Sequence, residues 1–256
     1  MWQDVSKLIL YDKDRGNKVG SLKECYLNGI GVGVGDPQMM TLKAVNAIRH
    51  SDVICLPRKD KEQCMAYKIA KAAVYEIDEK EIYCYEFEMT KDRDVLSDIH
   101  QNIYESIRSF MDNKKTVSFL TIGDPTVYST FSYIAKRAKA DGYEVNIING
   151  VTSFCACAAS LGISLCDFDS ELHIIPDVKY LKDSLKLPGT KVIMKCSRHV
   201  EYIKDCLREY EKDGKIEVYA VSDCGLEDEN KFYATENLPT EGNYMMTIII
   251  KEKILL

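Results

Sequence analysis

The sequence reads LTIGDPTVYSTFSY from Leu120 to Tyr133, and this stretch joins a buried strand to a helix through a short turn. The residues leading into the turn are mostly β-branched or aromatic, and the apolar run breaks at Gly123. Gly123 lets the backbone approach a ligand because it has no Cβ, and Asp124 adds a carboxylate. Pro125 stiffens the turn before a helix that we expect to begin near Tyr128. The stretch predicts a catalytic loop, although strand, turn and helix are also the ordinary joint of any α/β protein.

A second copy of this pattern lies upstream, where residues Tyr26–Pro37 read YLNGIGVGVGDP and the helical run TLKAVNAIRH follows. A strand again runs into glycines and then into Asp36 and Pro37. Two strand ends therefore carry GDP. This repetition favours a binding site over a simple structural joint.

From Tyr26 the apolar pattern alternates regularly between strands and helices. We predict strands at 26–34, 52–56, 81–86, 116–121 and 143–148, and helices at 40–50, 64–75, 94–112 and 128–141. This alternation predicts an N-terminal α/β domain over 26–148, with a mainly parallel sheet covered by helices on both faces. Within residues 1–25 a short apolar patch, LILY, is followed by the polar, glycine-interrupted stretch DKDRGNKVGS, and we interpret these residues as an N-terminal extension and a mobile arm.

The pattern changes at Asn149, where NGVTSFCACAASLG opens with a turn and a cap at Thr152 and Ser153, then continues through small residues. One clear helix, 199–212, separates the strands that follow. Those strands are predicted at 172–176, 190–195, 215–221, 231–236 and 244–251. We therefore predict a C-terminal domain over 149–256 with a mixed α/β sheet.

Ligands of parallel α/β sheets bind outside the carboxyl ends of the strands, and this rule selects the glycine turns as the candidate site. A dinucleotide site also needs an acidic residue at the end of the second strand, which here closes in LeuProArg. The sequence holds no GxxxxGK[ST] loop either, which disfavours ATP and GTP.

Composition indicates a soluble enzyme: 256 residues, 46% hydrophobic and 29% charged, with net charge −6. Scattered Lys and Arg argue against nucleic acid as a partner. No apolar run is long enough to cross a membrane, and the N-terminus lacks a signal-peptide core, so we expect a cytoplasmic protein. Ten cysteines include no CxxC pair and no suitably placed His, so we expect no metal site.

Four segments, GVGVGDPQMMTLKA, LTIGDPTVYSTFSY, NGVTSFCACAASLG and YAVSDCGLEDE, in this order and spacing, resemble the tetrapyrrole methylases of cobalamin and sirohaem synthesis. GDP followed by TVYSTFSY resembles the branch that methylates C-20 of precorrin-2 or cobalt-factor II. The resemblance covers nearly all of the chain after Leu27. It implies a two-domain enzyme, usually a homodimer, with S-adenosylmethionine in the cleft between the domains and S-adenosylhomocysteine as product.

The resemblance also assigns site residues, position by position. Those that correspond to cofactor contacts are Pro37, Gly123, Asp124, Val127, Thr152 and Ser153, with Lys195 and Gly225 matched less closely. Tyr244, expected to open the last strand, lies near the position where the family places a tyrosine beside the macrocycle, which makes it a catalytic candidate; its alternative role is that of a core aromatic residue. Two positions depart from the family, because Val34 and Asn149 stand where proline is usual.

Methyl transfer to C-20 leaves a hydrogen that must be removed, and Asp124 is our candidate base. Its alternative role is to cap the following helix. The substrate's carboxylates require local cations, for which Arg58, Lys59, Lys195 and Arg198 are candidates, each with a solvated surface role as the alternative. Other open functions are methylation at another ring position, a nucleotide-dependent oxidoreductase, and a non-catalytic tetrapyrrole carrier.

Overall fold

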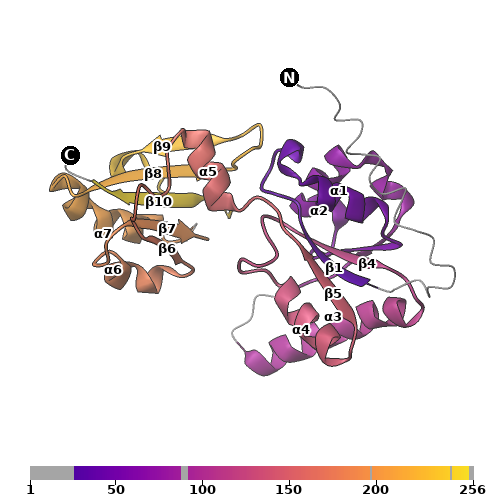
Figure 1. Cartoon of the computed structure of the whole chain (residues 1–256). Helices are drawn as coiled ribbons and strands as arrows, with labels where there is room; N and C mark the ends of the chain where they lie inside the picture. The colour runs from indigo at the N-terminus through magenta and orange to yellow at the C-terminus, as the bar shows by residue number, and fades with distance from the viewer. Residues whose placement is uncertain (1–25, 88–91, 197, 243, 254–256) are drawn as a thin grey trace, which may run out of the picture.

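A computed structural model describes residues 26–87, 92–196, 198–242 and 244–253. These residues form two five-stranded sheets, one in each half of the chain, that lie side by side (Figure 1). The predicted extension, residues 1–25, lies outside the described residues. No described helix has the length and apolar character needed to span a bilayer.

The first sheet has the strand order β3-β2-β4-β1-β5, and every pairing within it is parallel. Its strands are β1 (Tyr26–Gly31), β2 (Val53–Leu56), β3 (Glu81–Cys84), β4 (Val117–Thr121) and β5 (Glu144–Ile148). Its helices are α1 (Leu42–Arg49), α2 (Met65–Ala73), α3 (Arg93–Asp112) and α4 (Phe131–Ala140). The central strands β2 and β4 are buried along their whole length, as expected for a sheet covered on both faces.

Two separate cores lie on the two faces of this sheet. On one face, Ile30 and Leu56 pack with Ile48 of α1, together with residues of α2. On the other face, Phe119 packs with Phe131 of α4, together with residues of α3. Figure 1 shows the same division, with α1 and α2 on one side of the sheet and α3 and α4 on the other.

The second sheet has the order β6-β7-β10-β8-β9 and is mixed, because β6 and β7 are parallel whereas the other neighbours are antiparallel. Its strands are β6 (Leu172–Ile175), β7 (Thr190–Met194), β8 (Ile216–Ser222), β9 (Asn230–Tyr233) and β10 (Thr247–Glu252). α5 (Ser153–Leu161) covers one face, and α6 (Leu181–Ser184) and α7 (Val200–Lys212) cover the other. Along β10, Ile248 and Ile250 face α7 whereas Ile249 faces α5, which is the alternation that a strand dictates.

The predicted fold class, a two-part α/β protein with one parallel and one mixed sheet, is confirmed. The boundary between domains at residues 148 and 149 stays a prediction. Most predicted elements agree with the structure to within a few residues, but α6 was not predicted. The helix expected from Tyr128 begins only at Phe131, because Tyr128 has a left-handed backbone, φ +49°. The last strand begins at Thr247, so Tyr244 lies in the preceding turn and does not open the strand.

Candidate functional site

The turns after β4, β1 and β5 lie next to one another at the carboxyl edge of the first sheet, because β1 pairs with both β4 and β5 in parallel. From β1 the chain proceeds to β2 on one side of the sheet, and from β4 it proceeds to β5 on the other side. This reversal at β1 and β4 is the topological switch point, where ligands bind in open α/β sheets. Both GDP turns emerge at this point.

Glycines allow these turns to pack backbone against backbone. Gly123 N donates a hydrogen bond to Gly33 O at 2.7 Å. A Cβ on Gly31 would lie 2.4 Å from Gly123 O and 2.6 Å from Gly150 N. Real Cβ atoms do not approach backbone that closely, so a side chain at Gly31 would separate the turns that follow β4 and β5.

The Asp124 carboxylate joins two of these turns. Its Oδ1 accepts hydrogen bonds from the backbone N (2.8 Å) and the hydroxyl of Thr126, within its own turn. Its Oδ2 accepts from Asn149 Nδ2 (3.0 Å) and from Gly150 N (3.2 Å), in the turn after β5. Asp124 is only 6% exposed. Its carboxylate therefore holds the turns after β4 and β5 together, and it does not cap α4, which begins at Phe131.

These contacts also determine the ionisation of Asp124. Burial on its own raises the pKa of a carboxyl group, but here the hydrogen bonds from Thr126, Asn149 and Gly150 outweigh burial and lower the pKa of Asp124 below its usual value. The carboxylate is thus a stable anion whose two oxygens are both occupied. That arrangement favours a role in positioning the turns over a role as a base.

The second sheet reaches the first through the turn after β8. A Cβ on Gly35 would lie 2.4 Å from Cys224 O, and a Cβ on Gly225 would lie 2.7 Å from Asp36 N. The apolar cluster around α5 also contains Val34, from the turn after β1, and Met39 and Val127 pack against this cluster. The turn that ends in Pro37 therefore contacts the turn that contains Gly225.

The N-terminus of α5 carries two hydroxyl groups without partners. Thr152 stands at the N-cap position, but its side chain makes no capping hydrogen bond, which corrects the expected cap. Within the described part of the chain, Thr152 Oγ1 and Ser153 Oγ are buried and have no hydrogen-bond partner. Leaving a buried hydroxyl unpaired is costly, so these two atoms are suited to a polar ligand.

These residues fit S-adenosylmethionine. Its carboxylate, ammonium and ribose hydroxyls need close polar partners, which the two hydroxyls and the glycine backbones offer. The structure thus brings Pro37, Gly123, Asp124, Val127, Thr152, Ser153 and Gly225 to adjoining turns. Among the described residues, no group of three or more His, Cys, Asp or Glu side chains is placed to hold a metal ion.

Other predicted residues lie at the periphery. Lys195 follows β7 directly and is exposed, with φ +57°. Tyr244 is 53% exposed. Arg58, Lys59 and Arg198 are exposed as well, and Lys59 Nζ lies 3.6 Å from Glu86 Oε2. No described hydrogen bond or ion pair connects these three cations to Asp124.

Sequence reasoning missed several residues that build the site. Asn149 and Gly150, the donors to Asp124 Oδ2, were noticed only as part of a turn. Gly31 and Gly35 were visible as glycines, but their close contacts come from segments distant in the sequence. The left-handed conformation of Tyr128 had no sequence signal, since that backbone region is uncommon for a bulky residue.

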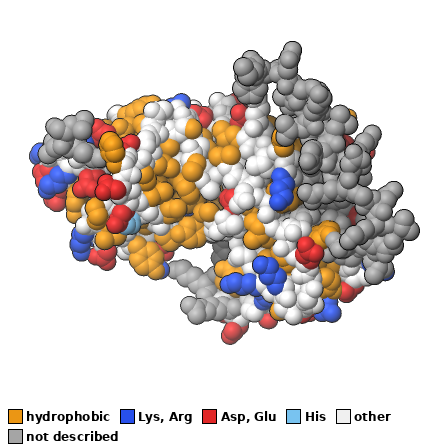
Figure 2. Space-filling view, in the orientation of Figure 1, with side chains coloured by type: hydrophobic (Ala, Val, Ile, Leu, Met, Phe, Trp, Pro, Cys, Tyr) orange, Lys and Arg blue, Asp and Glu red, His pale blue; other side chains and the backbone are white. Residues whose placement is uncertain are grey.

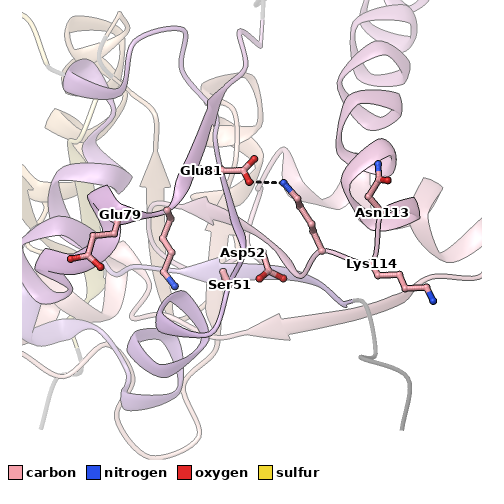
Figure 3. A pocket seen from close by; sticks show the side chains of 8 residues that line it. Ser51, Asp52, Glu79, Glu81, Asn113 and Lys114 are labelled. Carbon is pink, nitrogen blue, oxygen red and sulfur yellow. Dashed lines mark hydrogen bonds and ion pairs between the residues drawn. The ribbon is translucent and has the colours of Figure 1, made fainter. Parts of the chain in front are cut away.

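A separate hollow of about 420 Å³ lies at the opposite edge of the first sheet, where strands begin. Figure 3 shows its lining side chains. They are Ser51, Asp52, Glu79, Lys80, Glu81, Asn113, Lys114 and Lys115. Lys115 Nζ and Glu81 Oε1 are 2.5 Å apart, and Lys80 Nζ donates to Arg49 O. Two of its cations are thus engaged within the protein, and the hollow lies away from the carboxyl edge, so it is not our candidate site.

The sequence matches the family of Tetrapyrrole (Corrin/Porphyrin) Methylases over residues 26–238. Because this match spans most of the chain, the protein belongs to the tetrapyrrole methylases.

Individual relatives agree with this membership. A probable cobalt-precorrin-2 C(20)-methyltransferase of Methanocaldococcus jannaschii is 40% identical over 168 residues, which cover 65% of this chain and 70% of the relative. The cobalt precorrin-4 methyltransferase CbiF has a similar structure, with TM-score 0.70 and 18% identity over 88% of this chain and 94% of that one. The uroporphyrin-III C-methyl transferase of Thermus thermophilus, complexed with S-adenyl homocysteine, gives TM-score 0.62 and 17% identity, over 88% of this chain and 97% of that one. At these identities the two structural likenesses concern the fold alone.

Proposed function

We propose that this protein is an S-adenosylmethionine-dependent methyltransferase that methylates C-20 of precorrin-2 or cobalt-factor II in cobalamin biosynthesis. The main observation in favour of S-adenosylmethionine as the cofactor is that the hydroxyls of Thr152 and Ser153, beside the glycine turns, are buried and have no hydrogen-bond partner among the described residues. Family membership and the name of the relative from Methanocaldococcus jannaschii support the reaction and the ring position.

The cofactor, when bound, supplies a methyl group that its sulfonium makes electrophilic. The chain's own residues hold the two substrates in line, which is the main requirement for transfer to a nucleophilic carbon. Gly31, Gly33 and Gly123 let three backbones meet without side chains between them. Asp124 fixes the turns after β4 and β5 in place, and Thr152 and Ser153 orient the cofactor.

The substrate's carboxylates need cations. Arg58 and Lys59 follow β2, which neighbours β4 in the sheet, and Lys195 and Arg198 follow β7 of the second sheet. These four side chains are exposed, as is Tyr244 before β10, and the ion pair of Lys59 with Glu86 lies at the surface, where a bound anion can replace it. We assign the four cations to substrate binding, and we keep Tyr244 as a catalytic candidate beside the macrocycle. Asp124 is the candidate base, and the substitution Asp124→Asn tests this role because a base is required for turnover whereas a residue that only positions the turns is required for stability.

The proposed reaction is tested by incubating the protein with S-adenosylmethionine labelled with ¹³C in its methyl group and with cobalt-factor II or precorrin-2. We expect one label at C-20 in the NMR spectrum of the product. A label at another carbon would overturn the ring position, and binding of cobalt-factor II without transfer would indicate a carrier. Tight binding of a nicotinamide nucleotide instead would favour an oxidoreductase.

The cofactor site has a test of its own. Thr152→Val and Ser153→Ala remove hydroxyls that have no partner in the protein, so the free energy of unfolding without ligand should stay level or rise. Affinity for S-adenosylmethionine should fall about three- to thirtyfold, which corresponds to one or two lost hydrogen bonds. Calorimetric titration beside thermal unfolding separates these two effects. Unchanged affinity in both variants would remove these hydroxyls from the site.

We also propose that the protein works in the cytoplasm as a homodimer. On the face shown in Figure 2, hydrophobic side chains gather over the half of the molecule that contains the second sheet. In the same half of the chain, Phe168 in the loop before β6 is 99% exposed, and Leu172 is 37% exposed. Exposed apolar surface of this kind is typical of protein contacts. Light scattering of the purified protein should give twice the chain mass, and a mass of one chain would contradict the dimer.

A further inference from the structure

Six described residues other than glycine have a left-handed backbone. They are Lys114, Tyr128, Phe168, Lys195, Asp223 and Ala234. Three of them, Tyr128, Lys195 and Asp223, follow β4, β7 and β8, on the turns around the candidate site. Such conformations are costly for side chains with a Cβ, and they persist where surrounding structure imposes them, often at ligand sites.

Tyr128 is held in this conformation from both sides. Before it, Val127 N donates to Asp124 O at 3.1 Å, which closes the tight turn. After it, Ser129 Oγ donates to Thr121 Oγ1 at 3.1 Å and accepts from Phe131 N at 3.2 Å. The backbone at Tyr128, with φ +49°, is therefore fixed by its neighbours and not by its own side chain.

The Tyr128 ring gains nothing visible within the protein. It is 49% exposed and makes no hydrogen bond or ring contact with any described residue. Tyr133, on the helix that follows, stacks instead on His100 with ring centroids 4.3 Å apart. Lys114 shares the left-handed conformation for an ordinary reason, since its N donates to Met111 O where α3 ends. The hydrogen bonds of its neighbours fix the backbone at Tyr128, but no described contact within the protein uses its ring.

We propose that Tyr128 contacts the tetrapyrrole substrate directly, with its ring stacked against the conjugated face of the macrocycle. This inference rests on the proposed function. The adjoining residue, Val127, packs on the apolar cluster around α5, so Tyr128 stands at the rim of the candidate site. A planar conjugated face is the surface that an aromatic ring matches by offset stacking. Because the backbone is fixed in advance, little freedom is lost when the ring meets the macrocycle.

The experiment uses three variants of the full chain. Tyr128→Gly removes the ring and relieves the left-handed backbone, and Tyr128→Phe keeps the ring but removes the hydroxyl. Lys114→Gly, at the remote hollow, relieves the same conformation without touching the site. Binding of cobalt-factor II is followed by its absorbance in the presence of S-adenosylhomocysteine, KM for cobalt-factor II is measured for methyl transfer, and thermal unfolding monitors the fold.

We expect Tyr128→Gly to weaken binding of cobalt-factor II and raise KM by about three- to tenfold, with cofactor affinity unchanged. Tyr128→Phe and Lys114→Gly should both bind it as the wild type does. Equal affinity of Tyr128→Gly and wild type would overturn the role of the ring while leaving the methyltransferase intact. A loss in Tyr128→Phe as large as in Tyr128→Gly would overturn stacking in favour of the hydroxyl. Failure of the wild type itself to bind cobalt-factor II would refute the proposed function, and this role with it.

Discussion

Asp124→Asn separates a base from a residue that holds the turns together. Asparagine has nearly the same size as aspartate, but one carboxylate oxygen becomes an amino group that donates hydrogen bonds and accepts none. If the remaining oxygen keeps the two bonds from Thr126, the new amino group faces Asn149 Nδ2 and Gly150 N, which are both donors. The clamp between the turns after β4 and β5 is then broken.

The magnitude follows from those contacts. The exposed Asn149 side chain can turn its own oxygen toward the new group, so its loss is small. The Gly150 N–H loses a charged acceptor, and an unsatisfied donor of this kind costs about 1 to 3 kcal/mol. With the weaker bonds to Thr126 added, we expect a loss of about 2 to 3 kcal/mol in unfolding free energy. For a chain of this size that corresponds to a fall in Tm of about 4 to 12 °C.

Three measurements on the variant decide the question: urea unfolding, cofactor affinity by calorimetry, and single-turnover methyl transfer at saturating cofactor. We expect lower stability, weaker cofactor binding, and a methylation rate within about tenfold of wild type, because alignment and not proton removal is disturbed. Asp36→Asn is the matched control. Asp36 lies in the other GDP turn, where its carboxylate accepts a bond from Gln38 N at 2.8 Å, so we expect a loss under about 1 kcal/mol.

The contrary result is clear. A variant with wild-type stability and cofactor affinity but a rate lower by about 10² to 10⁴ would identify Asp124 as the general base. The hydrogen bonds at both oxygens would then have to be exchanged during turnover, and our account of the clamp would be wrong.

Two further predictions concern the docking of the halves and the dependence on pH. Gly35→Ala places a Cβ 2.4 Å from Cys224 O, and it should lower the unfolding free energy by about 1 to 3 kcal/mol and weaken cofactor binding. In the control Gly142→Ala, the new Cβ has nothing within 4 Å and should strain only its own turn. Equal cofactor affinity of the two variants, measured by calorimetry, would contradict the contact between Gly35 and Cys224. Burial, with a smaller effect of Arg137, lowers the pKa of His100 in the folded protein. The contribution of His100 to the free energy of unfolding is therefore complete above about pH 6.5 and declines as the pH falls through the folded pKa. The decline is at most about 1.4 kcal/mol per pH unit. His100→Phe should flatten this decline in urea unfolding between pH 7.5 and 5.5, and an unchanged slope would show that other groups cause it.

The first sheet was predictable because its central strands, β2 and β4, are buried on both faces. Segments such as VICL and VSFLT read as short apolar or β-rich runs between helical segments, and the alternation alone implies parallel order. The position of the site followed from the rule that ligands bind at the carboxyl ends of such strands. These inferences need only local pattern and chain order, and both are written in the sequence.

Contacts between distant segments were not predictable in this way. Nothing local in GVGDP indicates that Gly35 packs against Cys224. The predicted start of α4 was wrong for a related reason. Asp124 and Thr121 accept hydrogen bonds from hydroxyl groups of the loop, and these bonds compete with helix formation. A residue's local preference was overridden by partners that only the folded chain supplies.

The buried polar groups of the site are of two kinds: some have all their hydrogen-bond partners within the protein, and others have none in the part of the chain that the structure describes. A buried group whose bonds are complete within the protein, as in Asp124, maintains the shape of the site, whereas one that lacks partners, as in Thr152 and Ser153, gains most from a ligand. Lack of a partner is not sufficient, because Thr235 Oγ1 and Glu76 Oε2 are also buried and unpaired on elements outside the turns of the site. Position at the carboxyl edge makes the difference. At that edge the unpaired hydroxyls of Thr152 and Ser153 adjoin backbones that glycine leaves open, so a bound molecule can meet both at once.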